Sequence, residues 1–266
     1  MSIVLALLGY ALLTVLAAPA VIRGRWSIGH PRCALAAWYT FFGTGLLATA
    51  ASLVVAVALA SHRQATDTPW SDPTVLVLVA YLALAGLGAA IALVADRTEP
   101  MLHDEHATQH SLTGLAHALT YDVEHRRGVQ VSYVRASHAF VCAVPGRPAR
   151  VLVSSAAAEA LTRAELLCAV EHELAHLRGR HATVLRLANV NAACLPGVAA
   201  AQAMRRSTAL LLELAADDAA ARAHGVVATA GALRTMAGRT GDESMRLRAE
   251  RLLNRPPRPR ALTAIA

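Results

Sequence analysis

The chain has 266 residues, of which 55% are hydrophobic and only 16% are charged, whereas about 25% of the residues in a typical soluble domain carry charge. This composition excludes a disordered chain and an ordinary cytosolic globule. All 25 basic residues are arginines, and against 18 acidic residues they give a net charge of +7. Such a balance suits nucleic-acid binding or the arginine-flanked spans of a membrane protein, and the apolar content favours the membrane.

Three apolar segments without charges are long enough to cross a bilayer, which takes about 20 residues. They predict transmembrane helices over residues 3–22, 34–60 and 74–95. A signal peptide is the alternative for the first segment, because Ala18-Pro19-Ala20 imitates a cleavage site. A signal peptide needs basic residues ahead of its apolar run, and none is present here. We therefore expect the first helix to stay in the protein.

The positions of the arginines predict how these spans are oriented. The loop from Arg23 to Arg32 carries three arginines, whereas the loop from Ser61 to Pro73 carries one arginine beside two aspartates. Loops rich in arginine stay in the cytoplasm. We expect a multi-pass protein of the cell membrane whose transmembrane region is 1–95, whose N-terminus is outside, and whose remaining chain forms one cytoplasmic domain.

The domain predicted over 96–245 combines helices with a small sheet. Apolar residues at helical spacing predict a helix over 101–124, with four histidines on its solvated or membrane-facing side. Three β-favouring runs separated by turn signals predict a meander; the runs are 129–134, 139–144 and 150–153. The expected fold class is thus a mostly helical membrane protein with a cytoplasmic α+β peptidase domain.

The main functional motif lies on a helix that opens at Thr162 with a capping box, Thr-x-x-Glu. That helix contains His172-Glu173-Leu174-Ala175-His176, an H-E-x-x-H motif. Residues four apart share a helical face, so both imidazoles can bind one Zn²⁺ while Glu173 reaches the attacking water as general base. Two solvent-exposed histidines on an ordinary helix are the alternative, which the capped and apolar context disfavours.

A catalytic zinc needs a third protein ligand, and the sequence offers two candidates. His181 nearly completes a longer zinc motif, but it stands one residue too early and no Met-turn follows. Glu213 is the better candidate, because it shares a face with Asp217 on a second helix predicted over 204–224. Asp217 can then hydrogen-bond the far nitrogen of a ligand histidine. We expect one Zn²⁺ per chain.

A fourth apolar segment, 184–203, separates these two helices. A single crossing of the bilayer would put Glu213 and His172 on opposite sides, so we expect a buried helix or a re-entrant hairpin that turns at Pro196-Gly197. The arginine- and proline-rich residues 246–266 predict a solvated or headgroup-binding tail, without nucleic-acid binding. Four widely spaced cysteines indicate neither disulfides nor a cysteine zinc site.

Between Ala136 and Gly225 the chain resembles the gluzincin membrane peptidases. It is most similar to the BlaR/MecR-type antirepressor peptidase family, and next to the related HtpX and CAAX-prenyl-protease family. The HExxH and ExxxD pair carries the resemblance, which also implies a substrate-binding strand beside the active helix. The implied roles are zinc ligation by His172, His176 and Glu213, general-base catalysis by Glu173, orientation of a histidine by Asp217, and substrate pairing along a strand that opens with Ala139 and Phe140.

These observations predict an integral membrane zinc metalloendopeptidase that hydrolyses peptide bonds of a protein substrate. A cytoplasmic transcriptional repressor is one candidate substrate, and membrane proteins under HtpX-like quality control are the other. A catalytically silent membrane scaffold is the alternative function. The chain leaves no room for the extracellular penicillin-binding domain of the sensor relatives, so we do not expect antibiotic sensing. Arg222 and His224 are both candidates for stabilising the oxyanion, and the oligomeric state stays open.

Overall fold

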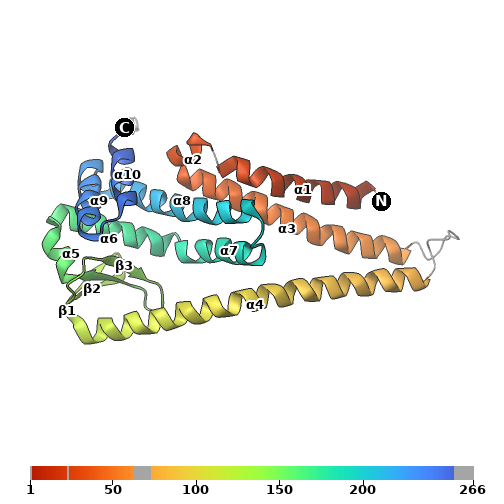
Figure 1. Ribbon diagram of the computed structural model, residues 1–266, viewed down its shortest axis with the longest axis horizontal. Coiled ribbons are helices and arrows are strands. Elements are labelled where there is room, and N and C mark those ends of the chain that lie inside the picture. The colour runs from red at the N-terminus through yellow and green to blue at the C-terminus, as the bar shows by residue number, and fades with distance from the viewer. Residues whose placement is uncertain (1, 23, 63–72, 255–266) are drawn as a thin grey trace, which may run out of the picture. The chain divides into compact units, whose positions relative to one another are not determined.

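A computed structural model describes residues 2–22, 24–62 and 73–254 (Figure 1). The arginine-poor loop at 63–72 and the end of the tail at 255–266 lie outside these residues. The chain forms two compact units, one of Met1–Ala107 with Thr183–Leu212 and one of Thr108–Ala182 with Glu213–Ala266. The two units are described separately below.

In the described residues of the first unit, all regular secondary structure is helical. α1 packs along α3, and the short α2 also contacts α3 (Figure 1). Trp38 is buried with Ala188 and Met204 in the core of this unit, and the Tyr39 hydroxyl donates a 2.6 Å hydrogen bond to the Val184 carbonyl. Its helices are α1 (Ser2–Ile22), α2 (Arg25–Gly29), α3 (Pro31–His62), and parts of α4 (Pro73–Leu119), α7 (His181–Cys194) and α8 (Ala199–His224).

The prediction of three membrane spans is not supported by the structure. Among the described residues, Pro31–Ala56 is the one helical stretch long and apolar enough to cross a membrane. The first predicted span coincides with α1, whose described apolar stretch is Ile3–Thr14; the side chains of residues 15, 16 and 18–22 are outside the described part. The third lies in α4, where the side chains of residues 73–80 and 82–84 are outside the described part. The multi-pass orientation has no support either.

The fourth apolar segment is a pair of helices joined by a turn. α7 ends at Cys194 and α8 begins at Ala199, and the Val198 N–H closes the turn by donating to the Leu195 carbonyl at 3.1 Å. Pro196-Gly197 therefore lies where the sequence predicts a reversal. Proline and glycine favour such a reversal, because proline cannot continue the hydrogen bonding of α7.

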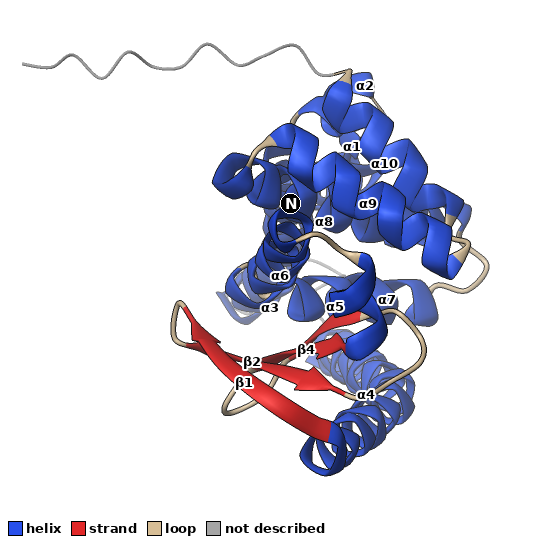
Figure 2. Ribbon diagram, turned by 90° about the vertical axis from the view of Figure 1, so that its left-hand side faces the viewer, coloured by secondary structure: helices blue, strands red, loops and turns tan. Residues whose placement is uncertain are grey.

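The second unit contains a four-stranded sheet in the order β1-β2-β4-β3 (Figure 2). β2 and β4 are parallel, whereas the other two pairs are antiparallel. The predicted meander is therefore wrong, because β4 lies between β2 and β3. Val151, Leu152 and Val153 are all buried, and a strand buried on both faces belongs in the centre of a sheet. The strands are β1 (Thr120–Arg126), β2 (Val129–Val134), β3 (Val141–Val144) and β4 (Arg150–Ser154).

β1 also corrects the predicted helix over 101–124, since α4 ends at Leu119 and the strand begins at Thr120. Arg127 and Gly128 connect β1 to β2 with φ values of 50° and 79°. A two-residue turn with positive φ at both positions matches the twist of a β-hairpin. The hairpin therefore pairs residues 120–124 with β2 as a strand, although their apolar residues have a helical spacing.

Helices cover both faces of this sheet. Val170 and Leu174 of α6 (Arg163–Arg178) pack against Val131, Val151 and Val153 on one face. Ala116, near the end of α4, packs against Val134 and Leu152 on the other face. The unit also contains the part of α8 from Glu213 onward and three further helices: α5 (Ser155–Ala160), α9 (Val226–Thr240) and α10 (Glu243–Leu253).

α10 includes residues that the sequence assigns to a solvated tail. It packs on α9 through Ala249 and Leu252, which are buried with Ala230 and Leu233. Arg248 is also buried, with 8% of its surface exposed. The apolar positions of residues 243–253 follow a helical period. The free energy gained by burying them against α9 therefore outweighs the preference of the neighbouring arginines for water.

Candidate active site

The local structure of α6 follows from its cap. The Thr162 hydroxyl accepts a hydrogen bond from the Glu165 N–H at 3.3 Å, and the Glu165 carboxylate accepts one from the Thr162 N–H at 2.9 Å. The predicted capping box is therefore confirmed. One side of α6 is anchored in the sheet by Val170 and Leu174. This anchoring fixes the direction in which the H-E-x-x-H residues project.

Three donor atoms converge beside α6, and they could hold a metal ion. The Nε2 atoms of His172 and His176 are 3.0 Å apart. The Glu213 carboxylate of α8 lies 3.4 Å from His172 Nε2 and 3.5 Å from His176 Nε2. Two donors of a tetrahedral zinc with bonds of 2.0–2.2 Å are about 3.4 Å apart. The spacing and the His, His, Glu chemistry therefore both fit zinc.

Asp217 lies on the other side of His172. Its carboxylate is 3.0 Å from His172 Nδ1 and is completely buried, so Nε2 of the same ring faces Glu213. Burial alone would lower the pKa of His172, but the hydrogen bonds to Asp217 and Glu213 outweigh it and raise the pKa to about 10. Asp217 thus fixes the ring orientation, as a carboxylate behind a metal-binding histidine does.

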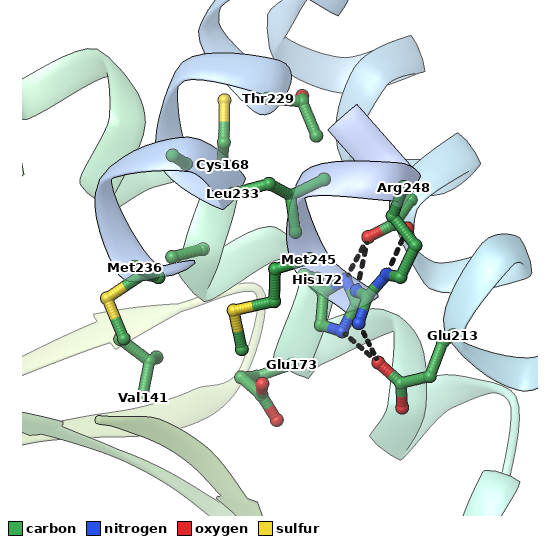
Figure 3. A pocket seen from close by; sticks show the side chains of 13 residues that line it. Val141, Cys168, His172, Glu173, Glu213, Thr229, Leu233, Met236, Met245 and Arg248 are labelled. Atoms are coloured by element: carbon green, nitrogen blue, oxygen red, sulfur yellow. Dashed lines mark hydrogen bonds and ion pairs between the residues drawn. The ribbon is translucent and has the colours of Figure 1, made fainter. Parts of the chain in front are cut away.

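Arg248 joins the carboxylates of Glu213 and Asp217, and no sequence pattern marks it as a site residue. It donates two hydrogen bonds to Asp217, at 2.8 Å from Nε and 2.7 Å from Nη2, and its Nη1 lies 2.9 Å from Glu213. Burial would raise the pKa values of both acids, but the hydrogen bonds and charges of Arg248 and His172 lower each to about 2. Both acids are therefore ionised at neutral pH. Figure 3 shows the Arg248 side chain above Glu213.

Glu173 is held by the sheet. Its carboxylate accepts a 2.8 Å hydrogen bond from the backbone N–H of Ala143 in β3. Burial raises the pKa of Glu173 to about 7, although the charge of His172 and the Ala143 hydrogen bond oppose the rise. A carboxylate with this pKa exchanges protons readily at neutral pH, which suits a general base.

His176 lies in a different environment from His172. Burial and the positive charge of His172 lower the pKa of His176 to about 4. Its Nδ1 is 3.0 Å from Nδ1 of His181, which begins α7. His181 therefore lies behind His176, on the ring edge opposite the nitrogen that faces Glu213. The group of three donors that could hold a metal does not include His181.

The two substrate-strand residues predicted from the resemblance precede β3 rather than forming it. The Phe140 N–H donates to the Ser154 hydroxyl at 2.9 Å, and its carbonyl accepts from the Ser154 N–H at 3.0 Å. Backbone groups alternate between the two edges of a strand. Because Phe140 faces β4, the backbone groups of Ala139, Val141 and Ala143 face the outer edge, where Ala143 meets Glu173.

Neither candidate for the oxyanion group lines the cavity of this site. Arg222 and His224 are exposed at the C-terminal end of α8, and His224 lines another cavity together with Arg126 and Arg127. Within the described part of the chain, Arg248 is the arginine that lines the site cavity. Sequence spacing did not single it out, because it lies 31 positions after Asp217 in an arginine-rich run.

Comparison with known proteins adds a family. The model of peptidase family M48 matches residues 102–244, which is more than half of the chain and includes His172, Glu173, His176, Glu213 and Asp217. It supports this metallopeptidase family and not the BlaR/MecR subtype. No curated protein and no solved structure matches the chain.

Proposed function

The chain belongs to peptidase family M48, a family of zinc metallopeptidases, and we propose that it is an integral membrane zinc metalloendopeptidase. The observation that carries the proposal is the convergence of His172, His176 and Glu213 at zinc-ligand spacing beside the half-buried carboxylate of Glu173. One Zn²⁺ would be held by these three residues. It would supply a Lewis acid that polarises the carbonyl of the substrate and makes water more acidic.

The residues of the chain then divide the work of peptide hydrolysis. Glu173 takes a proton from the attacking water, whose oxygen bonds to the carbonyl carbon. It returns the proton to the amide nitrogen as the C–N bond breaks. Asp217 keeps the His172 ring in place through Nδ1, and Arg248 keeps Asp217 and Glu213 ionised and close together. Arg248 therefore acts through other residues and is a positioning residue.

The outer edge of β3 supports a way of binding the substrate. An extended peptide pairs with an exposed strand through backbone hydrogen bonds, while its side chains enter flanking pockets. Val141 and Ala143 present their backbone groups to this edge, directly beside Glu173. Substrate pairing with Ala143 would compete with the hydrogen bond to Glu173 and free the carboxylate for proton transfer. We therefore assign the substrate-binding edge to Val141 and Ala143, together with Ala139.

The cellular setting is part of the same proposal. The candidate span Pro31–Ala56 favours a protein anchored in the membrane. If the arginine-rich loop before this span is cytoplasmic, an active site in the cytoplasm requires a second crossing, for which the apolar segment 74–95 is the candidate. Cleavage of a repressor rests on the BlaR/MecR resemblance, which the family match does not support. We therefore favour membrane proteins under quality control as substrates.

The proposal is tested by cleavage of an unbiased peptide library with the full chain purified in detergent. Wild type is compared with Glu173→Gln, and Glu159→Gln on the exposed side of α5 is the matched control. Wild type and the control should cut and Glu173→Gln should not, while all three hold about one zinc per chain. Bound zinc without cleavage in any of them would favour the silent scaffold. Wild type without zinc would refute the ligand set.

A further inference from the structure

The cavity that contains the site has a second half that the chemistry does not use. The whole cavity, with both halves together, has a volume of about 120 Å³. Figure 3 shows His172, Glu213 and Arg248 grouped together, and the apolar side chains of Val141, Met236 and Met245 gathered on the Glu173 side of the cavity. The lining of this apolar half includes Val141, Cys168, Ala232, Leu233, Met236 and Met245.

Four elements build the apolar half: β3, α6, α9 and α10. Cys168, Ala232 and Met236 are at most 8% exposed and belong to one buried cluster, against which Val141 and Met245 pack. The walls therefore come from the packing of α9 and α10 against α6. Two of the lining residues are methionines, whose unbranched side chains adapt to the shape of an occupant.

The polarity of the walls selects the chemistry of an occupant. No carboxylate, imidazole or guanidinium group lines this half; its polar groups are the buried Cys168 thiol and the Thr229 hydroxyl, which donates to the Gly225 carbonyl at 2.9 Å. A charged group placed there would be buried without a partner, which is strongly unfavourable. An apolar group gains from leaving water in proportion to the area it buries.

The volume selects the size of the occupant. An apolar protein cavity of about 150 Å³ holds one benzene molecule, whereas pockets for small-molecule ligands measure about 300–1,000 Å³. The whole cavity measures about 120 Å³ and is shared with the polar half, so the apolar half has room for at most a single aliphatic side chain. Val141 belongs to the strand whose outer edge meets Glu173, so a side chain of a peptide paired along that edge lies within reach of this half.

We propose that this apolar half, lined by Ala232, Met236 and Met245, binds the side chain of a substrate residue next to the cleaved bond and selects leucine or methionine there. The inference rests on the proposed peptidase function. It deepens that function by naming a substrate class, namely peptides with a medium-sized aliphatic residue at the cleavage site. It excludes peptides with acidic or basic residues at that position.

The test uses two substitutions that change the size of the cavity in opposite directions. Ala232→Leu fills it and Met236→Ala enlarges it, while Ala223→Leu and Leu247→Ala on exposed faces are the matched controls. The probes are peptides from the best-cut library sequence, with Ala, Leu, Met, Phe or Asp placed in turn on either side of the cleaved bond. Zinc content and kcat/KM are measured for every protein with every peptide.

Wild type and both controls should cut the Leu peptide at least about tenfold faster than the Ala peptide, because even one methylene in such a pocket changes the rate by about tenfold or more. Ala232→Leu should reduce this preference at least about tenfold without losing zinc. Met236→Ala should raise the rate for Phe relative to Leu. If Met236→Ala fails to fold, the change in the Leu-to-Ala preference of Ala232→Leu tests the proposal on its own.

Failure of this inference is distinguishable from failure of the proposed function. Cleavage without an aliphatic preference at either position, or with a preference that both substitutions leave unchanged, would overturn the inference and leave the peptidase function standing. If wild type cuts no peptide, the proposed function fails. In that case the affinities of labelled Leu and Asp peptides for the Glu173→Gln protein test the pocket. Equal affinities for the two peptides would refute the proposed preference for aliphatic side chains.

Discussion

The two halves of the site cavity are built on different principles. In the polar half, His172 contacts Glu213 and Asp217, and Arg248 links the same two acids through three interactions of 2.7–2.9 Å. In the apolar half, Val141, Met236 and Met245 form walls by packing alone. The comparison teaches that the polar half depends on exact pairs of charges, whereas the apolar half depends on volume and tolerates changes that conserve it.

The largest effect should come from removing a donor in the polar half. Glu213→Gln replaces a charged zinc ligand by a neutral amide, so we expect zinc affinity to fall more than the roughly 10- to 100-fold typical of changes behind the ligands. Met245→Leu, in the apolar half, should leave the affinity unchanged. Competition with a chromogenic chelator measures both. Equal affinities for the two variants would remove Glu213 from the ligand set.

Breaking the buried ion pair should have the next largest effect. Arg248→Met leaves the fully buried Asp217 carboxylate without its main partner, which typically destabilises a protein by about 3–5 kcal/mol. Adding Asp217→Asn removes the uncompensated charge, so the double variant should recover part of the loss. Denaturant unfolding of wild type, the two single variants and the double variant gives the coupling energy between Arg248 and Asp217. Additive effects of the two substitutions would contradict the pairing.

Acid should weaken the polar half in metal-free protein. Asp217 has its pKa lowered from 3.8 to about 2, so its contribution is fully present above pH 3.8 and is lost as the pH falls through about 2. The loss amounts to about 2 kcal/mol at about 1.4 kcal/mol per pKa unit. Thermal unfolding of chelator-treated protein between pH 5 and pH 2 measures it. Asp217→Asn should lack this component, and an equal slope in both proteins would refute the assignment.

The smallest effect should come from a volume-conserving change in the apolar half. Met236→Leu keeps the wall apolar and of similar size, so we expect a loss of stability below about 1.5 kcal/mol. Zinc content should stay at one per chain, and the preference for aliphatic residues should persist. Unfolding and peptide cleavage together check this. A loss of zinc would show that the two halves are coupled.

Sequence patterns predicted the parts of the molecule that depend on short-range spacing. The capping box at Thr162 and the strand 129–134 are present as expected, and α8 ends at His224. His172 and His176 share a face because they are four residues apart on one helix. The same patterns misassigned the end of α4 and the order of the strands. Residues 120–124 fit a helical period, and only pairing with β2 makes them a strand.

The sequence by itself determined the chemistry that we propose for this protein: the candidate donor set, the candidate general base, and the pair Glu213 and Asp217 on α8 follow from residue types at fixed helical spacing. The tertiary structure alone decided the position of β4 in the sheet, the contact of Ala143 with Glu173, and the arrival of Arg248 at Asp217 from α10. The physical reason is range. A helix repeats its geometry every few residues, so sequence spacing reports it, whereas contacts between distant segments depend on how whole helices and strands pack.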